Sequence, residues 1–190
     1  RLEPGDWIVQ NAANSGVGRA VIQLAKALGF RTLNVVRRSE LIPELQQIGG
    51  DVVVTEEMNL RDQVQALCGS KSPKLALNAV GGASALNLAN ALVPGAPLVT
   101  YGAMGRQPLK IPNSLLIFKN ISFHGFWLRR WKEAASPADV RETYQKLSAY
   151  LLSGVLHTPV HRTFPLSQVL DAVAEASREK RSGKVLLRMQ

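Results

Sequence analysis

The sequence contains one cysteine and three histidines among its 190 residues, and this scarcity excludes two kinds of site. A single thiol, Cys68, cannot form a disulfide within the chain. His124, His157 and His161 show no spacing typical of zinc ligands. No run of about 18 apolar residues is present either, which argues against a membrane-spanning helix. We therefore expect a domain without metal or membrane span, suited to a reducing compartment.

The charge balance is strongly basic, with a net charge of +9, although the hydrophobic fraction of 46% is that of an ordinary globular protein. A basic surface can attract nucleic acid, but it equally attracts NADPH or an acyl-CoA, because both are strongly anionic. No stretch interleaves basic with aromatic residues, and no nucleic-acid motif is present. A non-enzymatic module that binds nucleic acid or a protein partner therefore stays open only as a minor alternative.

The first residues predict that the sequence is a piece of a longer protein. Residues 1–6 read as a turn that enters a strand, and no methionine precedes them. Any targeting segment of the whole protein would then lie outside this sequence.

The most informative stretch is an apolar run, residues 7–10, that ends in a loop of small residues and continues into an amphipathic helix. This order is typical of a nucleotide cradle, because small residues let backbone N–H groups approach a pyrophosphate at a helix N-terminus. The pattern G-x-G-x-x-G is incomplete: Gly16 and Gly18 are present, but Ala12 or Ala13 takes the place of the first glycine. Alanine tolerates a positive φ poorly. The alternative is a turn whose glycines serve only packing.

The end of the second apolar run, residues 31–36, indicates which cofactor is bound. NAD sites usually place a carboxylate here, whereas NADP sites place arginine and small polar residues. This chain has Arg37, Arg38 and Ser39, with Glu40 only afterwards. A guanidinium can bind a phosphate through two hydrogen bonds, so we expect NADPH. The alternative is a solvated basic pair that opens a helix, a position that disfavours positive charge.

Strands and helices alternate, which predicts an α/β fold with a doubly wound, parallel, six-stranded Rossmann sheet. Ser136 and Asp139 form a capping box at the start of the last helix. The expected strands are 7–10, 32–36, 51–55, 75–78, 98–101 and 121–125. The expected helices are 17–28, 40–48, 60–68, 83–92 and 137–153.

After Gly154 the pattern changes to an extended segment (158–164), an amphipathic helix (166–176) and a final strand (183–189). We interpret residues 1–154 as an NADP-binding Rossmann domain. Residues 155–190 are then a return segment of a second domain that is mostly missing from the sequence.

Six segments together resemble the medium-chain dehydrogenase/reductase superfamily, and within it the mitochondrial-type trans-2-enoyl-CoA (enoyl-thioester) reductases. Quinone reductases of the superfamily have Gly-Gly-Val-Gly where this chain has residues 14–18, and they lack the Gly-Phe-Trp element. The segments are 10–18 (QNAANSGVG), 33–37 (LNVVR), 77–82 (LNAVGG), 99–104 (VTYGAM), 115–119 (LLIFK) and 125–128 (GFWL).

The resemblance implies a set of cofactor contacts and a catalytic (GroES-like) domain for the return segment. The contacts are Asn14, Ser15, Gly16 and Val17 at the pyrophosphate; Arg37, Arg38 and Ser39 at the 2′-phosphate; Tyr101, Gly102, Ala103 and Met104 at the nicotinamide; Phe126, Trp127 and Leu128 as walls of the nicotinamide and acyl channel; and Lys184, which reaches back from near the C-terminus.

Some of these residues also have plain structural interpretations. Tyr101 can simply end a buried strand, and Lys184 can be solvated. Phe126 and Trp127 are adjacent on a strand, so one is expected in the core and the other at the site. We expect His124 to be packed rather than catalytic.

The implied reaction is the reduction of a trans-2-enoyl thioester in fatty acid synthesis, with hydride from NADPH to the β-carbon. The tyrosine that usually donates a hydrogen bond to the thioester belongs to the preceding domain in this family, so no catalytic residue is expected in this chain. Alone it should bind NADPH weakly and turn over little substrate. An NADPH-dependent quinone or alkenal reductase, or a zinc-free alcohol dehydrogenase-like protein, is the alternative of the same class.

The resemblance also implies a homodimer, paired through the sheet edge at 121–126. The expected compartment is the cytoplasm in a bacterium or the mitochondrial matrix in a eukaryote.

Overall fold

A six-stranded parallel sheet forms the centre of the protein in a computed structural model that describes residues 1–69, 71–178 and 183–189. The strand order is β3-β2-β1-β4-β5-β6, the order of a Rossmann fold, and it confirms the predicted fold class. The strands are β1 (Trp7–Gln10), β2 (Arg31–Val36), β3 (Val52–Thr55), β4 (Leu75–Asn78), β5 (Pro97–Thr100) and β6 (Ser122–Gly125).

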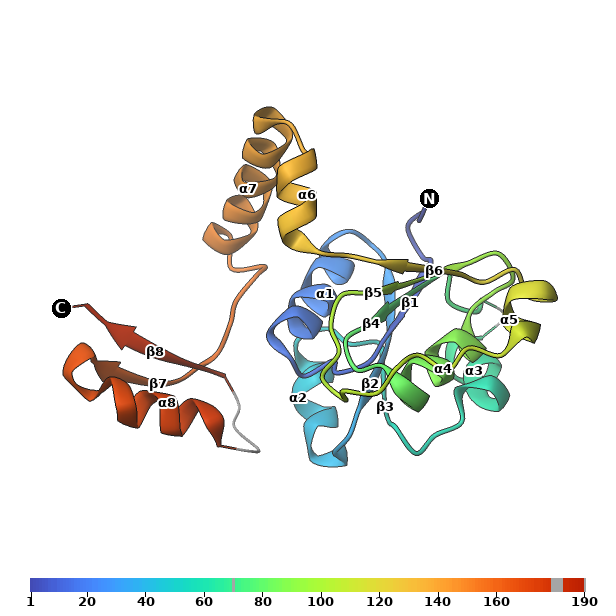
Figure 1. Ribbon diagram of the computed structural model, residues 1–190, viewed down its shortest axis with the longest axis horizontal. Coiled ribbons are helices and arrows are strands. Elements are labelled where there is room, and N and C mark those ends of the chain that lie inside the picture. Colours follow the sequence, from blue (N-terminus) through green and yellow to red (C-terminus); the bar gives the residue numbers. More distant parts are fainter. Residues whose placement is uncertain (70, 179–182, 190) are drawn as a thin grey trace.

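Helices cover both faces of this sheet, with α1 and α2 on one face and α3, α4 and α5 on the other (Figure 1). Alternate strand residues supply the two cores, as the pleat of a strand requires. Val53 packs with Ile22 of α1, whereas Val54 packs with Leu60 of α3 and Leu88 of α4. The helices are α1 (Gly16–Ala27), α2 (Ile42–Gln47), α3 (Leu60–Cys68), α4 (Gly82–Ala91), α5 (Asn113–Ile117), α6 (Leu128–Ala134) and α7 (Pro137–Leu152).

The predicted helices differ from the observed ones mainly in the second helix and in two short additions. Residues 40–48 do not form one helix: a 3-10 turn over Ser39–Leu41 precedes α2, which has a proline in its first turn. Helices α5 and α6, of five and seven residues, are too short for an apolar period to reveal them. The capping box at α7 is confirmed, with the Asp139 N–H donating to Ser136 Oγ at 3.1 Å.

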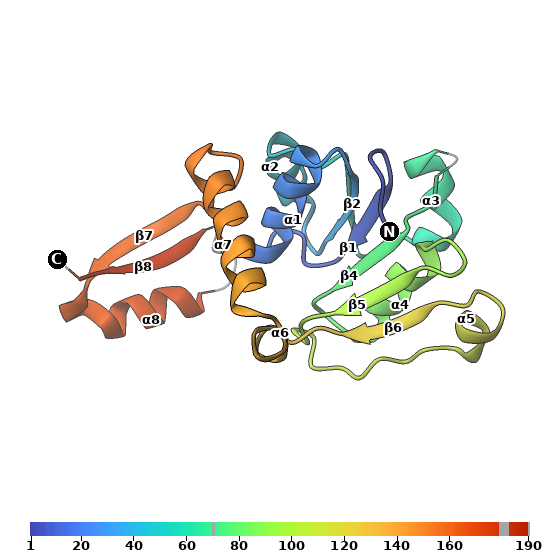
Figure 2. The same cartoon turned by 90° about the horizontal axis from the view of Figure 1, so that it is seen from above.

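The C-terminal segment forms a small unit of its own, which lies to one side of the six-stranded sheet (Figures 1 and 2). Strands β7 (Val160–Pro165) and β8 (Lys184–Arg188) pair in parallel, and α8 (Val169–Ser177) lies between them in sequence. Large apolar side chains of this unit, among them Leu170, Val173 and Met189, are exposed. Within the described part of the chain, no helix is long and apolar enough to span a bilayer.

Candidate functional site

The loop between β1 and α1 turns sharply because one residue adopts a left-handed conformation. This residue is Ala12, with φ of 47°, at the place where the incomplete pattern has alanine instead of glycine. A non-glycine residue in this region is strained, and such strain is concentrated at functional sites. The loop then passes close to the helix: a Cβ on Gly18 would lie 2.6 Å from the Ala13 carbonyl oxygen. Gly18 therefore serves the close packing of α1 against the loop.

Polar side chains fix the loop at the start of α1. Ser15 caps the helix, with its Oγ accepting a hydrogen bond from the Gly18 N–H at 3.1 Å. Arg19, buried in the first turns of α1, donates through Nε to the Asn14 carbonyl at 3.1 Å and pairs with Glu44 of α2 at 2.8 Å. Sequence reasoning missed Arg19 and Glu44. The first turn of a helix leaves N–H groups without intrahelical acceptors, so the fixed loop presents donors to an anion.

The two arginines that follow β2 differ in their surroundings. Arg38 forms an ion pair with Glu40, in which its Nη1 lies 3.4 Å from the Glu40 Oε1, so its positive charge is partly neutralised. Arg37 is exposed, and no acidic group among the described residues pairs with it. Ser39 opens the 3-10 turn and is exposed. Of these two arginines, Arg37 is thus the one that is free to bind a ligand phosphate.

The loops after β4 and β5 run together and continue the pairing of their strands. The Tyr101 N–H donates to the Asn78 carbonyl at 3.0 Å, and the Met104 N–H donates to the Ala79 carbonyl at 2.9 Å. Glycine permits this closeness, since a Cβ on Gly102 would lie 3.0 Å from the Ala79 oxygen. Gly81, with φ of 91°, approaches the Gln107 carbonyl in the same way. These two loops form one wall of a crevice at the carboxyl ends of the strands. The wall is mostly backbone, so a flat ring can lie against it.

Tyr101 brings an unsatisfied hydroxyl to the crevice. Its Oη is buried and has no hydrogen-bond partner among the described residues. Burial raises the pKa of Tyr101. The Ser15 side chain lies close enough to oppose that rise in part, but without the geometry of a hydrogen bond. A buried polar atom without a partner calls for one, and a polar ligand held between the loop at Ser15 and β5 would supply it. These residues therefore fit a dinucleotide.

A chain of buried hydrogen bonds, missed by sequence reasoning, supports the loops from below. Asn78 Oδ1 accepts from Asn11 Nδ2 at 2.8 Å and from the N–H groups of Val80 and Gly81 at 3.1 Å and 3.0 Å. Asn78 Nδ2 donates to Thr100 Oγ1 at 3.0 Å. Asn11 also binds Ser84, whose hydroxyl donates to Glu56 at 2.8 Å. Their shared signal was available: Asn11, Asn78, Thr100 and Glu56 lie at or within a residue of the ends of strands, where ligands of such sheets bind.

Lys184 lies beside the nucleotide loop although it comes from the C-terminal unit. A Cβ placed on Gly16 would be 3.3 Å from the Lys184 Nζ, and no carboxylate among the described residues pairs with this ammonium. Residues of the nucleotide loop and of the C-terminal segment together line a cavity of about 250 Å³. The residues that line it are Asn14, Ser15, Gly16, Arg19, Thr158, Pro159, Gly183 and Lys184.

The aromatic residues after β6 are not arranged as predicted. Phe126 and Trp127 are 46% and 63% exposed, so the expectation that one of them lies in the core is wrong. His124 is exposed too and contacts Ser122 at 3.2 Å, so the expected packing of its ring is also wrong. The physical reason is that β6 is an edge strand, and residues 126–128 continue past the end of β5. Leu128 begins α6 and is exposed.

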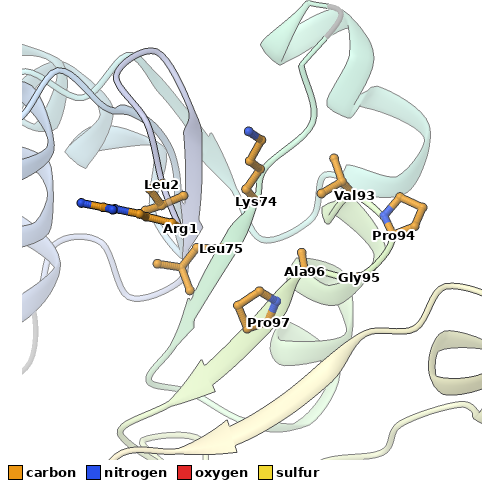
Figure 3. A pocket seen from close by; sticks show the side chains of 9 residues that line it. All are labelled: Arg1, Leu2, Lys74, Leu75, Val93, Pro94, Gly95, Ala96 and Pro97. Carbon is orange, nitrogen blue, oxygen red and sulfur yellow. The ribbon is translucent and has the colours of Figure 1, made fainter.

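Another cavity lies at the opposite end of the strands, beside the amino ends of β4 and β5 (Figure 3). Its volume is about 380 Å³, and mostly apolar residues, including Leu75, Val93 and Pro97, line it. One cation there, Lys74, is already paired with Asp6 at 2.9 Å. Ligands of open α/β sheets bind at the carboxyl ends of the strands, so this cavity is not the candidate cofactor site.

The described residues contain no group of three or more potential metal ligands of the His, Cys, Asp and Glu types.

Comparison with known proteins gives a family and a set of relatives. The family model "Zinc-binding dehydrogenase" matches residues 16–148. The mitochondrial enoyl-[acyl-carrier-protein] reductase of Homo sapiens is 41% identical over 100% of this chain and 52% of its own length. That of Dictyostelium discoideum is 47% identical over 77% of this chain and 43% of its own length. The chain thus spans about half the length of the curated relatives it matches.

Solved structures agree with this assignment. The mitochondrial 2-enoyl thioester reductase Etr1p/Etr2p heterodimer from Candida tropicalis superposes with a TM-score of 0.85 and 30% identity, covering 92% of this chain and 53% of that one. An Etr1p complex with NADP and crotonyl-CoA gives a TM-score of 0.82 with 30% identity, over 93% and 53%. A protein from Bacillus thuringiensis named as an NADPH:quinone reductase gives 0.86 with 28% identity, over 97% and 56%. The predicted resemblance is confirmed.

Proposed function

Because this chain belongs to the zinc-binding dehydrogenase family, we propose that it is the NADPH-binding part of an oxidoreductase that reduces the C=C bond of trans-2-enoyl thioesters. The observation that carries the cofactor part of this proposal is the Tyr101 hydroxyl, which is buried, has no hydrogen-bond partner in the described part of the chain and lies beside the strained loop at Ser15. The names of the relatives support the substrate. A dinucleotide lying across the carboxyl ends of β1 and β4 would meet that hydroxyl and the first turn of α1 together.

The cofactor contacts follow from the charges around this crevice. The backbone N–H groups of Gly16 and Val17 at the start of α1 are the donors for the pyrophosphate, since the Ser15 N–H already donates to the Ala12 carbonyl at 2.9 Å. Ser15 contributes its side chain, and Asn14 lies in the loop fixed by Arg19. Lys184, which lines the same 250 Å³ cavity, adds a positive charge beside Gly16. The 2′-phosphate binds Arg37 first; Arg38, already paired with Glu40, and Ser39 contribute less.

The nicotinamide end lies toward the loop after β5. The bound NADPH supplies the hydride, while the protein supplies orientation and excludes water. The backbone of Tyr101, Gly102, Ala103 and Met104 forms a wall against which the ring is held. The exposed residues Phe126, Trp127 and Leu128 follow β6 at the same edge of the sheet and offer an apolar surface to an acyl chain. The catalytic acid comes from the other half of the protein.

The division of the chain into residues 1–154 and 155–190 belongs to the same proposal. The exposed apolar side chains of α8 and β8 are those of a unit that packs against a further part of the protein.

Strand β6 pairs with β5 alone among the described strands, so its outer edge is free to pair with the β6 of a second copy. Since the curated relatives are named mitochondrial, we propose the mitochondrial matrix for a eukaryotic source and the cytoplasm for a bacterial one.

A quinone or alkenal reductase is the second candidate, favoured by the structural similarity to the bacterial protein named as an NADPH:quinone reductase. Rates of NADPH oxidation by the whole protein with crotonyl-CoA and with a quinone separate the two. Faster turnover of the thioester supports the first proposal, and faster turnover of the quinone replaces it with the second.

Cofactor choice is tested by fluorescence titration of the whole protein with NADPH and NADH. We expect Arg37→Ala to weaken NADPH binding by roughly tenfold to a hundredfold, because hydrogen bonds to charged groups contribute about 1.5–3 kcal/mol. NADH binding should not change. Arg61→Ala, at an exposed position on α3, is the matched control. An unchanged ratio of the two affinities in Arg37→Ala would contradict the assigned 2′-phosphate site.

A further inference from the structure

Helix α1 holds the C-terminal unit through the side chain of Gln23. Gln23 is 5% exposed and faces the segment that connects α7 to β7. The His157 N–H donates to Gln23 Oε1 at 3.2 Å, and Gln23 Nε2 donates to the His157 carbonyl at 3.2 Å. The side-chain amide therefore pairs with the backbone of one residue through two hydrogen bonds, as a neighbouring strand residue would. We refer to this pair as the Gln23–His157 clasp.

The clasp is connected to Lys184 through a short, rigid path. Two residues after His157, the Pro159 carbonyl accepts a hydrogen bond from the Lys184 N–H at 2.8 Å. The preceding residue, Gly183, has φ of 88°, and a Cβ there would lie 2.6 Å from the Pro159 oxygen. Only glycine permits so close an approach. The backbone of Lys184 is therefore set by the position of residues 157–159.

The side chain of Lys184 then returns to the helix that carries the clasp. Its Nζ lies beside Gly16, the first residue of α1, and Gln23 follows seven residues later on the same helix. A rise of about 1.5 Å per residue separates the two points along the helix axis by roughly 10 Å. One helix thus anchors the C-terminal segment at Gln23 and receives its lysine at the N-terminus.

We propose that Gln23 is a positioning residue, which holds residues 157–159 against α1 so that the Lys184 ammonium stays at the nucleotide loop. This inference rests on the proposed function, since it takes the loop to bind the anionic part of NADPH. Without the clasp, the β7–β8 unit would depend on fewer contacts with the Rossmann sheet. Binding would then have to order the unit as well as the lysine, at a cost in affinity.

The experiment is a double-mutant cycle with Gln23→Ala and Lys184→Ala in the whole protein. The NADPH dissociation constant is measured by fluorescence, and the melting temperature is recorded for every variant. We expect each single variant to bind NADPH about tenfold more weakly, as the loss of one charge-assisted contact implies. The double variant should be no more than about twofold weaker than Lys184→Ala, because Gln23 acts through Lys184.

Two further variants control for general damage. Gln46→Ala, at an exposed glutamine of α2, should leave binding unchanged. His157→Ala removes the ring, whose Nδ1 and Nε2 lie 3.1 Å and 3.2 Å from Gln23 Nε2, but retains both backbone groups of the clasp. Its loss should therefore be smaller than that of Gln23→Ala, which removes all of these contacts. Should Gln23→Ala not fold, Gln23→Glu takes its place in the cycle, because it keeps the acceptor for the His157 N–H and loses the donor.

The outcomes separate the inference from the function on which it rests. Losses that multiply in the double variant would overturn it, and so would a Lys184→Ala variant that binds NADPH normally. In both cases, an NADPH preference that depends on Arg37 would leave the proposed cofactor site standing. Failure of the unmodified protein to bind NADPH would remove both proposals.

Discussion

Asn11 and Asn78 join the two central strands of the sheet at their carboxyl ends, where Asn11 Nδ2 donates to Asn78 Oδ1 at 2.8 Å. β1 and β4 are the neighbours at which the strand order changes direction, and in such sheets this is where a ligand crevice forms. Both side chains are fully buried. The floor of the crevice is therefore built from paired amides, and its shape depends on their hydrogen bonds.

Replacement of Asn78 by alanine should destabilise the protein by about 2–4 kcal/mol. The N–H groups of Val80 and Gly81 and the hydroxyl of Thr100 would lose their partner, and buried groups left unsatisfied cost about 1–3 kcal/mol each, without full additivity. Chemical denaturation gives the free energy of unfolding. Asn113→Ala, at an exposed position, should change it by less than about 0.5 kcal/mol. Equal stability of the two variants would show that the amide network is dispensable.

Gly18→Ala and Gly16→Ala should separate stability from binding. A Cβ on Gly18 would lie 2.6 Å from a backbone oxygen, an overlap that should cost about 1–3 kcal/mol of stability. A Cβ on Gly16 would meet only the end of the Lys184 side chain, which can move away. Gly16→Ala should therefore keep the melting temperature and weaken NADPH binding. Thermal melts and NADPH titrations of both variants test this, and a loss of stability in Gly16→Ala alone would contradict it.

Ala12→Gly should stabilise the protein slightly, by roughly 0.5 kcal/mol. Glycine removes the strain at a φ of 47°, and this gain exceeds the entropy that glycine loses on folding. Ala13→Gly is the matched control, because Ala13 is fully buried in the core beside Ile22. Its unfolding free energy should fall by about 1 kcal/mol. Denaturant midpoints of the two variants should thus move in opposite directions.

Cys68 should make stability depend on pH in the alkaline range. Burial, helped by the charge of Asp51, raises the pKa of this thiol to about 11, whereas the pKa of an unfolded cysteine is about 8.5. The unfolded chain releases the proton first, so stability is fully present below about pH 8.5 and is lost as the pH rises toward about 11. The unfolding free energy of Cys68→Ala should fall less over this range. Parallel pH profiles would rule out a thiol contribution.

The sequence predicts most of the sheet because buried parallel strands are near-continuous apolar runs separated by glycine-rich turns. All six strands of the larger sheet were expected within a residue of their observed bounds, and the capping box fixed the start of α7. Helices α5 and α6 could not be predicted, since a helix of one or two turns carries no measurable apolar period. The exposure of Phe126 and Trp127 depends on what covers the end of β6, which is tertiary information.

The proposed cofactor site could be predicted in part from the sequence. Gly16, Gly18 and Arg37 stand out because backbone geometry and phosphate chemistry restrict the residue type at those positions. The sequence does not single out Arg19, Glu44 and Gln23, because their partners lie 5 to 134 residues away along the chain. A polar helix residue with such a partner cannot be distinguished in the sequence from one that faces solvent. Only the resemblance to a known family suggested that Lys184 lies near the cofactor, and its proximity to Gly16 could be seen only in the folded structure.

The Gln23–His157 clasp has a thermodynamic consequence that runs in the reverse direction. If the clasp strengthens the binding of NADPH, then bound NADPH must stabilise the clasp by the same free energy, because coupling between two equilibria is reciprocal. Bound nucleotide would therefore slow the exchange of the His157 amide hydrogen with solvent, and the β7–β8 unit would respond to a ligand held mainly by another part of the chain. The redox cofactor would then also regulate how firmly the two units of this chain are joined.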